Sequence, residues 1–401
     1  MRRLKNAIIP MLLLIGLMWG LCPSMLAVRT AHADQADTGS ETVDMEKGDV
    51  PQPAASDDDD TESEPMPLTD ADVAVQSAVI PDDAIASGTV GTCLFYITPD
   101  LEMVVTPSDG TSGVLPEGSK NSDWPWYRYA AYIKTVRFDK GVKTGKTLEW
   151  AFSNGSEDAD AYNRLESVDF TNLDATSLTS MKGILAYDRT LTSVNLNMLN
   201  AVQIKYLNEA FRTTGIATLD LTPIGDKNLW TIDNMCNSCT QLETVRTGWT
   251  LPVLHYAQGT FAEDANLTDI DAGGWRFGKA GSLSLMFKGC SSLKALDVSR
   301  WDMGTVWCLY WTFGSCTGLK TLDVSGWNTG SLRDARGIFS NCTGLATLDV
   351  SGWNTGKATS FEQTFNNCKN LTALDVSKWD TSNVTDMTYL FNQCTCPARW
   401  T

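Results

Sequence analysis

The stretch "TLDVSGWNTG" occupies residues 321–330, and the same ten residues recur at positions 347–356, a spacing of 26 residues. A catalytic site is a single constellation of unlike groups. A stretch that recurs at a fixed spacing instead indicates a structural unit that stacks on copies of itself. The repetition therefore favours a repeat architecture over an enzyme domain, and it predicts more copies elsewhere in the chain.

Further copies align on a leucine or isoleucine that opens each unit. Three residues after each opener comes another apolar residue, and the best copies read Leu-Asp-Val-Ser, as at Leu296 to Ser299. This apolar–polar alternation with a β-branched valine predicts a short strand with one buried face. The openers recur at steps of 25 or 26 residues and predict about nine coils: Leu165, Leu191, Ile216, Leu242, Leu267, Leu293, Leu319, Leu345 and Leu371.

The second half of each unit has a different period. Val306, Leu309 and Phe313 are separated by three and four residues, which would place them on one face of a helix. Thr305, just before them, is a residue that can cap a helix start. Each coil is therefore predicted to be a strand, a turn and a short helix. A unit of this kind buries its apolar stripe only by stacking on its neighbours, as in a solenoid.

At this point the repeat resembles a known family. The pattern Cys-x-x-Leu-x-x-Leu-Asp-Val-Ser-x-Trp-(Asp/Asn)-Thr, closed by Phe-x-x-Cys, is similar to that of BspA-like leucine-rich-repeat surface proteins of bacteria. Residues 91–105, "GTCLFYITPDLEMVV", look like the segment that often precedes such repeats. The resemblance covers residues 91–394 and implies an exported, adhesin-like binding protein. No wall-sorting signal of that family is seen, which leaves the mode of surface retention open.

The predicted fold class is α/β, a leucine-rich-repeat-type solenoid over residues 164–395. A β-rich capping segment over residues 89–163 precedes it, and an irregular tail over residues 396–401 follows. Residues 1–33 have the basic start, the apolar run and the Ala-His-Ala ending of an export signal, with an uncleaved membrane anchor as the alternative. We therefore expect a secreted or cell-surface protein.

The charge of the chain is unevenly distributed. Of the formal net charge of −17, residues 34–83 carry 16 acidic residues against Lys47 alone. Such a segment buries too little apolar surface to fold, so residues 34–88 are predicted to be a disordered acidic linker. Nucleic-acid binding needs clustered lysine and arginine, and the chain has no basic stripe. We therefore expect no nucleic-acid partner.

Two columns of side chains recur once per coil. We expect the cysteines to be buried free thiols, because five equivalent side chains that point the same way cannot all pair; disulfides are the alternative in an exported protein. We expect the tryptophans to be core residues, with exposed sugar-stacking indoles as the alternative. The columns are Cys290, Cys316, Cys342, Cys368 and Cys394, and Trp249, Trp275, Trp301, Trp327, Trp353 and Trp379.

A row of aspartates is the candidate binding site. Each lies between two inward-facing residues, so it should point outward from the strand face. Adjacent strands are about 4.8 Å apart, and like charges at that distance in water repel by roughly 0.8 kcal/mol per pair. Either nearby serines and backbone groups relieve the repulsion, or the row binds a cation or a basic partner. The row consists of Asp271, Asp297, Asp323, Asp349 and Asp375.

Catalytic and metal-binding motifs are not found. His255 is the only histidine after the signal, and we expect it to be structural; Cys236-x-x-Cys239 has no second ligand pair for zinc. We expect no enzyme activity and no cofactor. The predicted function is binding of a host or neighbouring-cell surface macromolecule, a protein rather than a glycan, by a monomer. The alternatives are a structural spacer that displays a missing domain, and a carbohydrate-binding or carbohydrate-active module.

Overall fold

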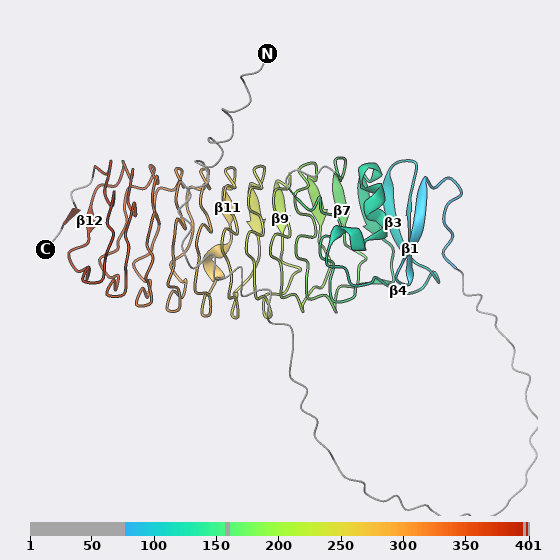
Figure 1. Ribbon diagram of the computed structural model, residues 1–401, viewed down its shortest axis with the longest axis horizontal. Coiled ribbons are helices and arrows are strands. Elements are labelled where there is room, and N and C mark those ends of the chain that lie inside the picture. Colours follow the sequence, from blue (N-terminus) through green and yellow to red (C-terminus); the bar gives the residue numbers. More distant parts are fainter. Residues whose placement is uncertain (1–76, 157–160, 396–397, 400–401) are drawn as a thin grey trace, which may run out of the picture. The chain divides into compact units, whose positions relative to one another are not determined.

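The computed structural model describes residues 77–156, 161–395 and 398–399. The predicted export signal lies outside the described residues, as does the predicted linker up to residue 76. The described chain starts with an antiparallel meander of β1 (Ala86–Val90), β2 (Cys93–Ile97) and β3 (Glu102–Pro107) (Figure 1). Strand β1 begins three residues before the predicted start of the capping segment.

The capping segment continues directly into the solenoid through one sheet. Strand β3 pairs in parallel with β5 (Thr135–Phe138), β5 with β7 (Ser167–Asp169), and β7 with β8 (Ser193–Asn195). The sheet therefore changes from antiparallel to parallel at β3. From that point the coils add parallel strands or strand-like segments to one surface, which we call the strand face.

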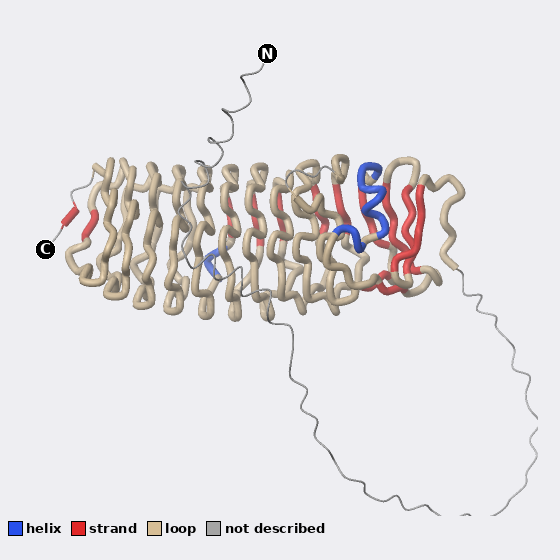
Figure 2. The backbone as a smooth tube through the Cα atoms, viewed as in Figure 1, coloured by secondary structure: helices blue, strands red, loops and turns tan. Residues whose placement is uncertain are grey.

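The remaining strands of the strand face are short. Strands β9 (Thr218–Asp220), β10 (Thr244–Arg246) and β11 (Asp269–Ile270) form a parallel set, and β12 (Leu374–Asp375) pairs with β13 (Ala398–Arg399). The tail predicted to be irregular thus contributes a strand. Between β11 and β12 the coils keep the same path. On the strand face one isolated β-bridge joins them there, from Thr321 to Thr347. Figure 2 shows these coils as loops that stack side by side.

Small elements complete the capping segment. Strands β4 (Gly113–Val114) and β6 (Val142–Lys143) pair in parallel. The helical elements of the described chain are three 3₁₀ segments: η1 (Asn121–Asp123), η2 (Pro125–Tyr132) and η3 (Ala272–Gly274).

The predicted helix in the second half of each coil is wrong. Around Val306 to Phe313 the chain forms consecutive turns, closed by bonds such as Thr312 N–H to Leu309 O at 3.2 Å. Trp311 and Ser315 have φ values of 51° and 62°. A right-handed helix requires negative φ throughout, so a left-handed residue at every fourth position excludes it. The chain is a β-solenoid with few helical turns rather than an α/β one.

The turns are held together by bonds between coils. Every second amide donates to the next coil, as from Leu309 to Asp334 O at 2.9 Å and from Phe313 to Ile338 O at 3.0 Å. The side chains that point inward from these turns, such as Val306, Leu309 and Phe313, lie three and four residues apart, which explains why the sequence pattern resembles that of a helix. We call the outer surface of this ladder the turn face.

The ladder of the turn face also corrects the predicted count of nine coils. Within the described residues the ladder joins ten successive positions, because its first rung, Thr147, lies in the segment predicted to be only a cap. The rungs are Thr147, Ser180, Tyr206, Thr231, Tyr256, Ser282, Cys308, Asp334, Ser360 and Asp386.

The tryptophan column is core, as predicted, and the sugar-stacking alternative for it is wrong. All six indoles are buried, and neighbouring rings such as Trp301 and Trp327 stack with centroids 6.1 Å apart. The indole Nε1 of Trp327 donates to Val298 O of the preceding coil at 3.0 Å. The column thus joins the coils by ring contact and by hydrogen bonds.

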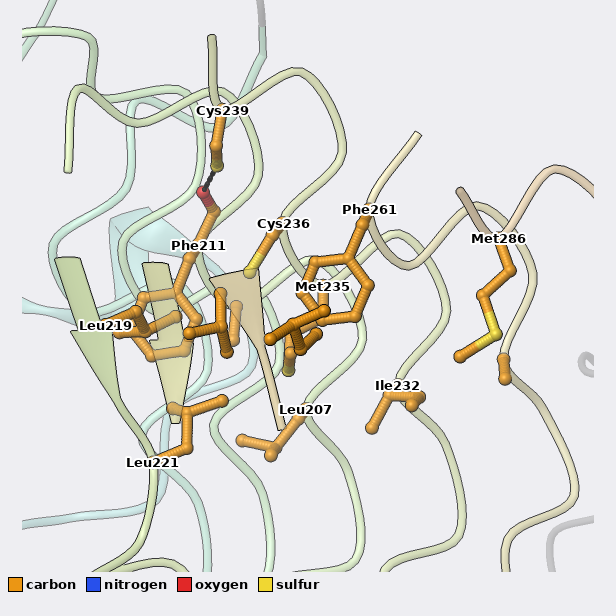
Figure 3. Close-up of a cluster of buried hydrophobic side chains, with 14 of the residues drawn as sticks. Leu207, Phe211, Leu219, Leu221, Ile232, Met235, Cys236, Cys239, Phe261 and Met286 are labelled. Carbon is orange, nitrogen blue, oxygen red and sulfur yellow. Dashed lines mark hydrogen bonds between the residues drawn. The ribbon is translucent and has the colours of Figure 1, made fainter. Parts of the chain in front are cut away.

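The cysteine column contains free thiols, as predicted. Four of its five members are buried, and Cys394 is half-buried. The Cys316 thiol donates to Phe287 O at 3.0 Å, and Cys239 makes the same contact with Phe211 O at 2.9 Å (Figure 3). Burial raises the pKa of Cys316 to about 12. These thiols pack as small apolar groups that also donate one hydrogen bond to the preceding coil.

Aspartate replaces cysteine at two places in this column, at Asp188 and Asp264, and both are buried. Asp264 Oδ1 accepts a hydrogen bond from Cys239 N at 2.8 Å, whereas Oδ2 has no hydrogen-bond partner among the described residues. Burial, and then the nearby Cys239, raise the pKa of Asp264 well above its usual range. A neutral carboxyl group thus occupies a position where sister coils have a thiol.

Candidate functional site

The strand face brings four of the five predicted aspartates into one row. Each accepts a hydrogen bond from the amide of the serine two residues later, and in three of them the serine hydroxyl also donates at 2.7 Å, as Ser325 does to Asp323. This local turn is the relief by serine and backbone that the sequence suggested. The row consists of Asp297, Asp323, Asp349 and Asp375; we call it the acidic row.

Two members of the acidic row, Asp297 and Asp349, are more acidic than simple repulsion predicts. We expected mutual repulsion to raise the proton affinity of its middle members. For Asp349 this is wrong: the hydroxyl and amide of Ser351 lower its pKa, and the opposing effect of Asp375 is smaller. Ser299 likewise lowers the pKa of Asp297. Both carboxylates are therefore ionised at neutral pH.

Asp271, the fifth predicted residue, has a different role. Its carboxylate accepts bonds from Thr247 N at 2.8 Å and from Gly248 N at 3.0 Å, in the preceding coil. These bonds tie two coils together, so Asp271 belongs to the fold. In the same preceding coil the register places Arg246 beside Asp271, and Arg246 pairs with Asp269 and ends the negative row.

A shallow depression crosses the strand face beside the acidic row. It spans three coils, and the side chains around it are short and mostly polar, so the two carboxylates are accessible from outside. Its lining includes Thr321, Asp323, Ser325, Thr347, Asp349 and Thr372.

Replacing Asp349 by asparagine should slightly destabilise the protein at pH 7. Because folding lowers the pKa of this carboxyl, its contribution is present above the unfolded pKa and is lost as the pH falls through the folded one. The residue is exposed, so the effect should be at most about 0.5 kcal/mol. Chemical denaturation at pH 7 and pH 3 would measure it, and a variant more stable at pH 7 than the original would show that repulsion dominates.

The turn face carries exposed aromatic residues that break the repeat. Trp230 is 40% exposed and stacks on His255 of the next coil with ring centroids 3.6 Å apart. His255 Nδ1 also lies 2.7 Å from Val253 O. These contacts give the lone histidine the structural role that we predicted.

A second aromatic cluster occupies the turn face of a single coil and comprises Trp307, Tyr310 and Trp311. We call it the indole platform. Arg336 of the next coil lies over Tyr310 with its guanidinium 4.9 Å from the ring centroid. The sequence analysis missed this cluster because it followed residues that recur. The available signal was the departure from the repeat, since the corresponding positions one coil later are Arg333 and Gly337.

No candidate metal site and no candidate membrane-spanning helix is found among the described residues. In the described ranges no group of three histidine, cysteine or acidic side chains is placed to hold a metal ion. Within the same ranges no helix has the length and hydropathy that crossing a bilayer requires.

Comparison with known proteins gives one sequence-family match. The family described as "Mycoplasma protein of unknown function, DUF285" matches residues 254–374 and 339–396. No curated protein sequence matches this chain.

The solved structures that match include three bacterial leucine-rich-repeat proteins of low identity. A leucine-rich-repeat protein from Eubacterium ventriosum is 15% identical, with 79% of this chain and 97% of that chain covered at a TM-score of 0.34. One from Bacteroides ovatus is 14% identical, covering 78% and 99%, with a TM-score of 0.29. A leucine-rich cell surface protein from Faecalibacterium prausnitzii is 13% identical, covering 80% and 96%, with a TM-score of 0.24.

The ladders of strands, turns, tryptophans and cysteines carry the fold assignment independently of these similarities. Residues 254–396 match the DUF285 family model, and the described chain is a leucine-rich-repeat-type β-solenoid similar to BspA-like bacterial surface proteins.

Proposed function

We propose that this chain is an exported bacterial surface protein that binds a protein partner through its strand face. The observation that supports this most is the acidic row, in which carboxylates held by serine turns repeat at one register of the ladder. A linear array of fixed negative charge selects a partner that presents basic residues at matching intervals. The adjoining depression would give such a partner surface to contact.

The proposed role is non-catalytic. Nucleophilic catalysis by cysteine needs an accessible thiolate, whereas Cys239, Cys308 and Cys316 are all buried. His255 is stacked on Trp230, which leaves it poorly placed to act as a base. A monomer that acts through its surface remains our expectation. A spacer without a partner is the alternative that the following experiment addresses.

Replacing Asp323 and Asp349 together by asparagine should weaken capture of the partner at least about tenfold, because binding loses two fixed charges while the serine turns remain. The bait is the full chain, the source is surface proteins of host or neighbouring cells, and capture is quantified by mass spectrometry at low and at physiological salt. The difference should shrink at high salt.

The matched control replaces Asp302 and Asp380 by asparagine. Both are exposed, and the corresponding positions of the two coils between them already hold Asn328 and Asn354, so the fold should tolerate the change. This control removes the same charge from a neighbouring column and should capture as the original chain does. An equal loss of capture in both variants would show that only the net charge matters. If the original chain captured no protein, the spacer function would be favoured.

A further inference from the structure

The indole platform on the turn face has a geometry that its repeat position does not require. Trp311 lies across two glycines: its pyrrole ring contacts Gly337 of the next coil, and its benzene ring contacts Gly314. In the same way Trp307 lies over Gly281, where an added Cβ would approach Nε1 to 2.6 Å. Each indole thus packs against the backbone of at least one glycine. Both side chains remain partly exposed to solvent.

The left-handed backbone at Trp311 is shared by this position of the other coils. Its φ is 51°, and Leu285 and Trp150 have φ values of 62° and 57° there. Trp150 also lies over a glycine of the next coil, Gly183. What sets the platform apart is that one coil carries two indoles on its turn face, Trp307 and Trp311.

The surroundings of the platform are polar and fixed. Arg336 makes two bonds to Asp334, Nε to Oδ1 at 3.0 Å and Nη2 to Oδ2 at 2.8 Å, while it covers Tyr310. Arg333 is exposed beside it, and Glu362 and Gln363 follow in the next coil. A flat apolar ring face surrounded by hydrogen-bonding groups fits a ligand that has C–H faces and hydroxyl edges. Pyranose sugars have this structure.

Two other ligand classes fit less well. Aromatic residues that anchor protein partners sit in desolvated pockets behind a rim that excludes water. The rings of the platform are instead partly exposed and lie beside polar groups. Single-stranded nucleic acid also stacks on aromatic rings, but it needs a positive groove along its backbone. Here Asp334 neutralises Arg336, and the chain carries a net charge of −17.

The position of the second aromatic cluster indicates an extended ligand. Trp230 and Trp307 occupy the same place in their coils, just before the rungs Thr231 and Cys308. Three steps of the ladder separate these rungs, or about 14 Å at the usual strand spacing. A chain of sugars along the stack would therefore meet both clusters, whereas a single sugar would meet one.

We infer that the indole platform binds the pyranose rings of a polysaccharide, at a site separate from the acidic row. This inference concerns a different face and a different ligand class from the proposed protein partner, so either can fail without the other. Its residues, Trp307 and Trp311, are also different tryptophans from the buried column considered for sugar binding in the sequence.

The test replaces Trp307 by threonine and Trp311 by asparagine in the full chain. Threonine is the residue at the equivalent position of two later coils, Thr359 and Thr385, and asparagine tolerates the left-handed backbone. Both changes should therefore preserve the fold, which thermal unfolding would verify. The probes are hydroxyethylcellulose, laminarin, mannan, glycol chitosan and polygalacturonate, each cast into native gels that measure affinity by retardation.

At least one neutral polymer should retard the original chain, and the double variant should lose affinity for it at least about tenfold, because both rings that would stack on the sugars are removed. Trp311→Phe, which keeps a ring on the same glycines, should have intermediate affinity. The matched control, Thr359→Ala with Gln363→Asn, changes the same two positions two coils later and should bind as the original does. The asparagine variant of Asp323 and Asp349 should also bind sugar normally.

Three results would overturn the inference: no retardation by any of the five polymers, equal retardation of the original chain and the double variant, or retardation by polygalacturonate alone that salt abolishes. If the double variant instead lost capture of a protein, the platform would be part of a protein interface and the inference would be wrong.

Discussion

Replacing Trp327 by alanine is expected to lower the free energy of unfolding by about 4 kcal/mol, the usual cost of truncating a buried tryptophan. The indole is 3% exposed and stacks between Trp301 and Trp353, with both centroid distances 6.1 Å. Its removal leaves a cavity that spans three coils. It also removes the hydrogen-bond donor that Nε1 supplies to Val298 O.

The damage should be local, because each coil of a solenoid contacts only its neighbours. Chemical denaturation followed by circular dichroism would measure the loss. Hydrogen exchange should become faster in the coils that open at Leu293, Leu319 and Leu345, and remain unchanged near β5. The control is Trp230→Ala on the turn face, where 40% exposure predicts a loss below about 1 kcal/mol. Similar losses in the two variants would contradict the buried column.

The column residues were predictable because one side chain per coil had to repeat. Stacking places equivalent residues in contact, so an inward position is constrained in every coil, and period alone identifies Trp327 and Cys316 as core. The path of the backbone between columns was not predictable in this way. Inward side chains in consecutive turns recur at three and four residues, which is also the helical spacing, and the left-handed φ of Trp311 or Leu285 has no signal in residue type.

The candidate sites also differ in whether their residues repeat from coil to coil. The acidic row was predictable because it repeats with the fold, and its serine turns were a stated alternative. The different role of Asp271 was not predictable, because its carboxylate accepts hydrogen bonds from Thr247 and Gly248 in another coil. The indole platform was missed because it is made of residues that do not repeat. In a chain of near-identical coils, such departures carry the information about ligands.

Replacing Asp264 by cysteine should stabilise the protein by about 2 kcal/mol or more at pH 8, the range for a buried polar group that lacks a partner. The thiol would restore the column and could donate to the preceding coil, as Cys290 does to Phe261 O at 3.1 Å. Asp264 Oδ2, by contrast, has no hydrogen-bond partner in the described part of the chain.

The stabilisation should depend on pH in a defined direction. Burial raises the folded pKa of Asp264, so its contribution is fully present below the unfolded pKa and is lost as the pH rises through the folded one. The advantage of the cysteine variant should therefore be smallest at pH 4, where only the unpartnered Oδ2 is relieved, and should grow toward pH 8. Asp349→Asn is the control with the opposite sign, since its pKa is lowered. An advantage of equal size at pH 4 and pH 8 would show that Asp264 is not a buried neutral acid.

The central structural claim is that the second face of the coil is a ladder of turns, on which the indole platform depends. Spin labels on cysteines introduced at Lys205 and Arg333 would test it by double electron–electron resonance. Both residues are exposed and precede the rungs Tyr206 and Asp334, five steps apart. A turn ladder predicts a separation near 24 Å at the strand spacing of about 4.8 Å. Packed helices, 8–10 Å apart, would place the labels at about 40 Å or more, and that result would contradict the account.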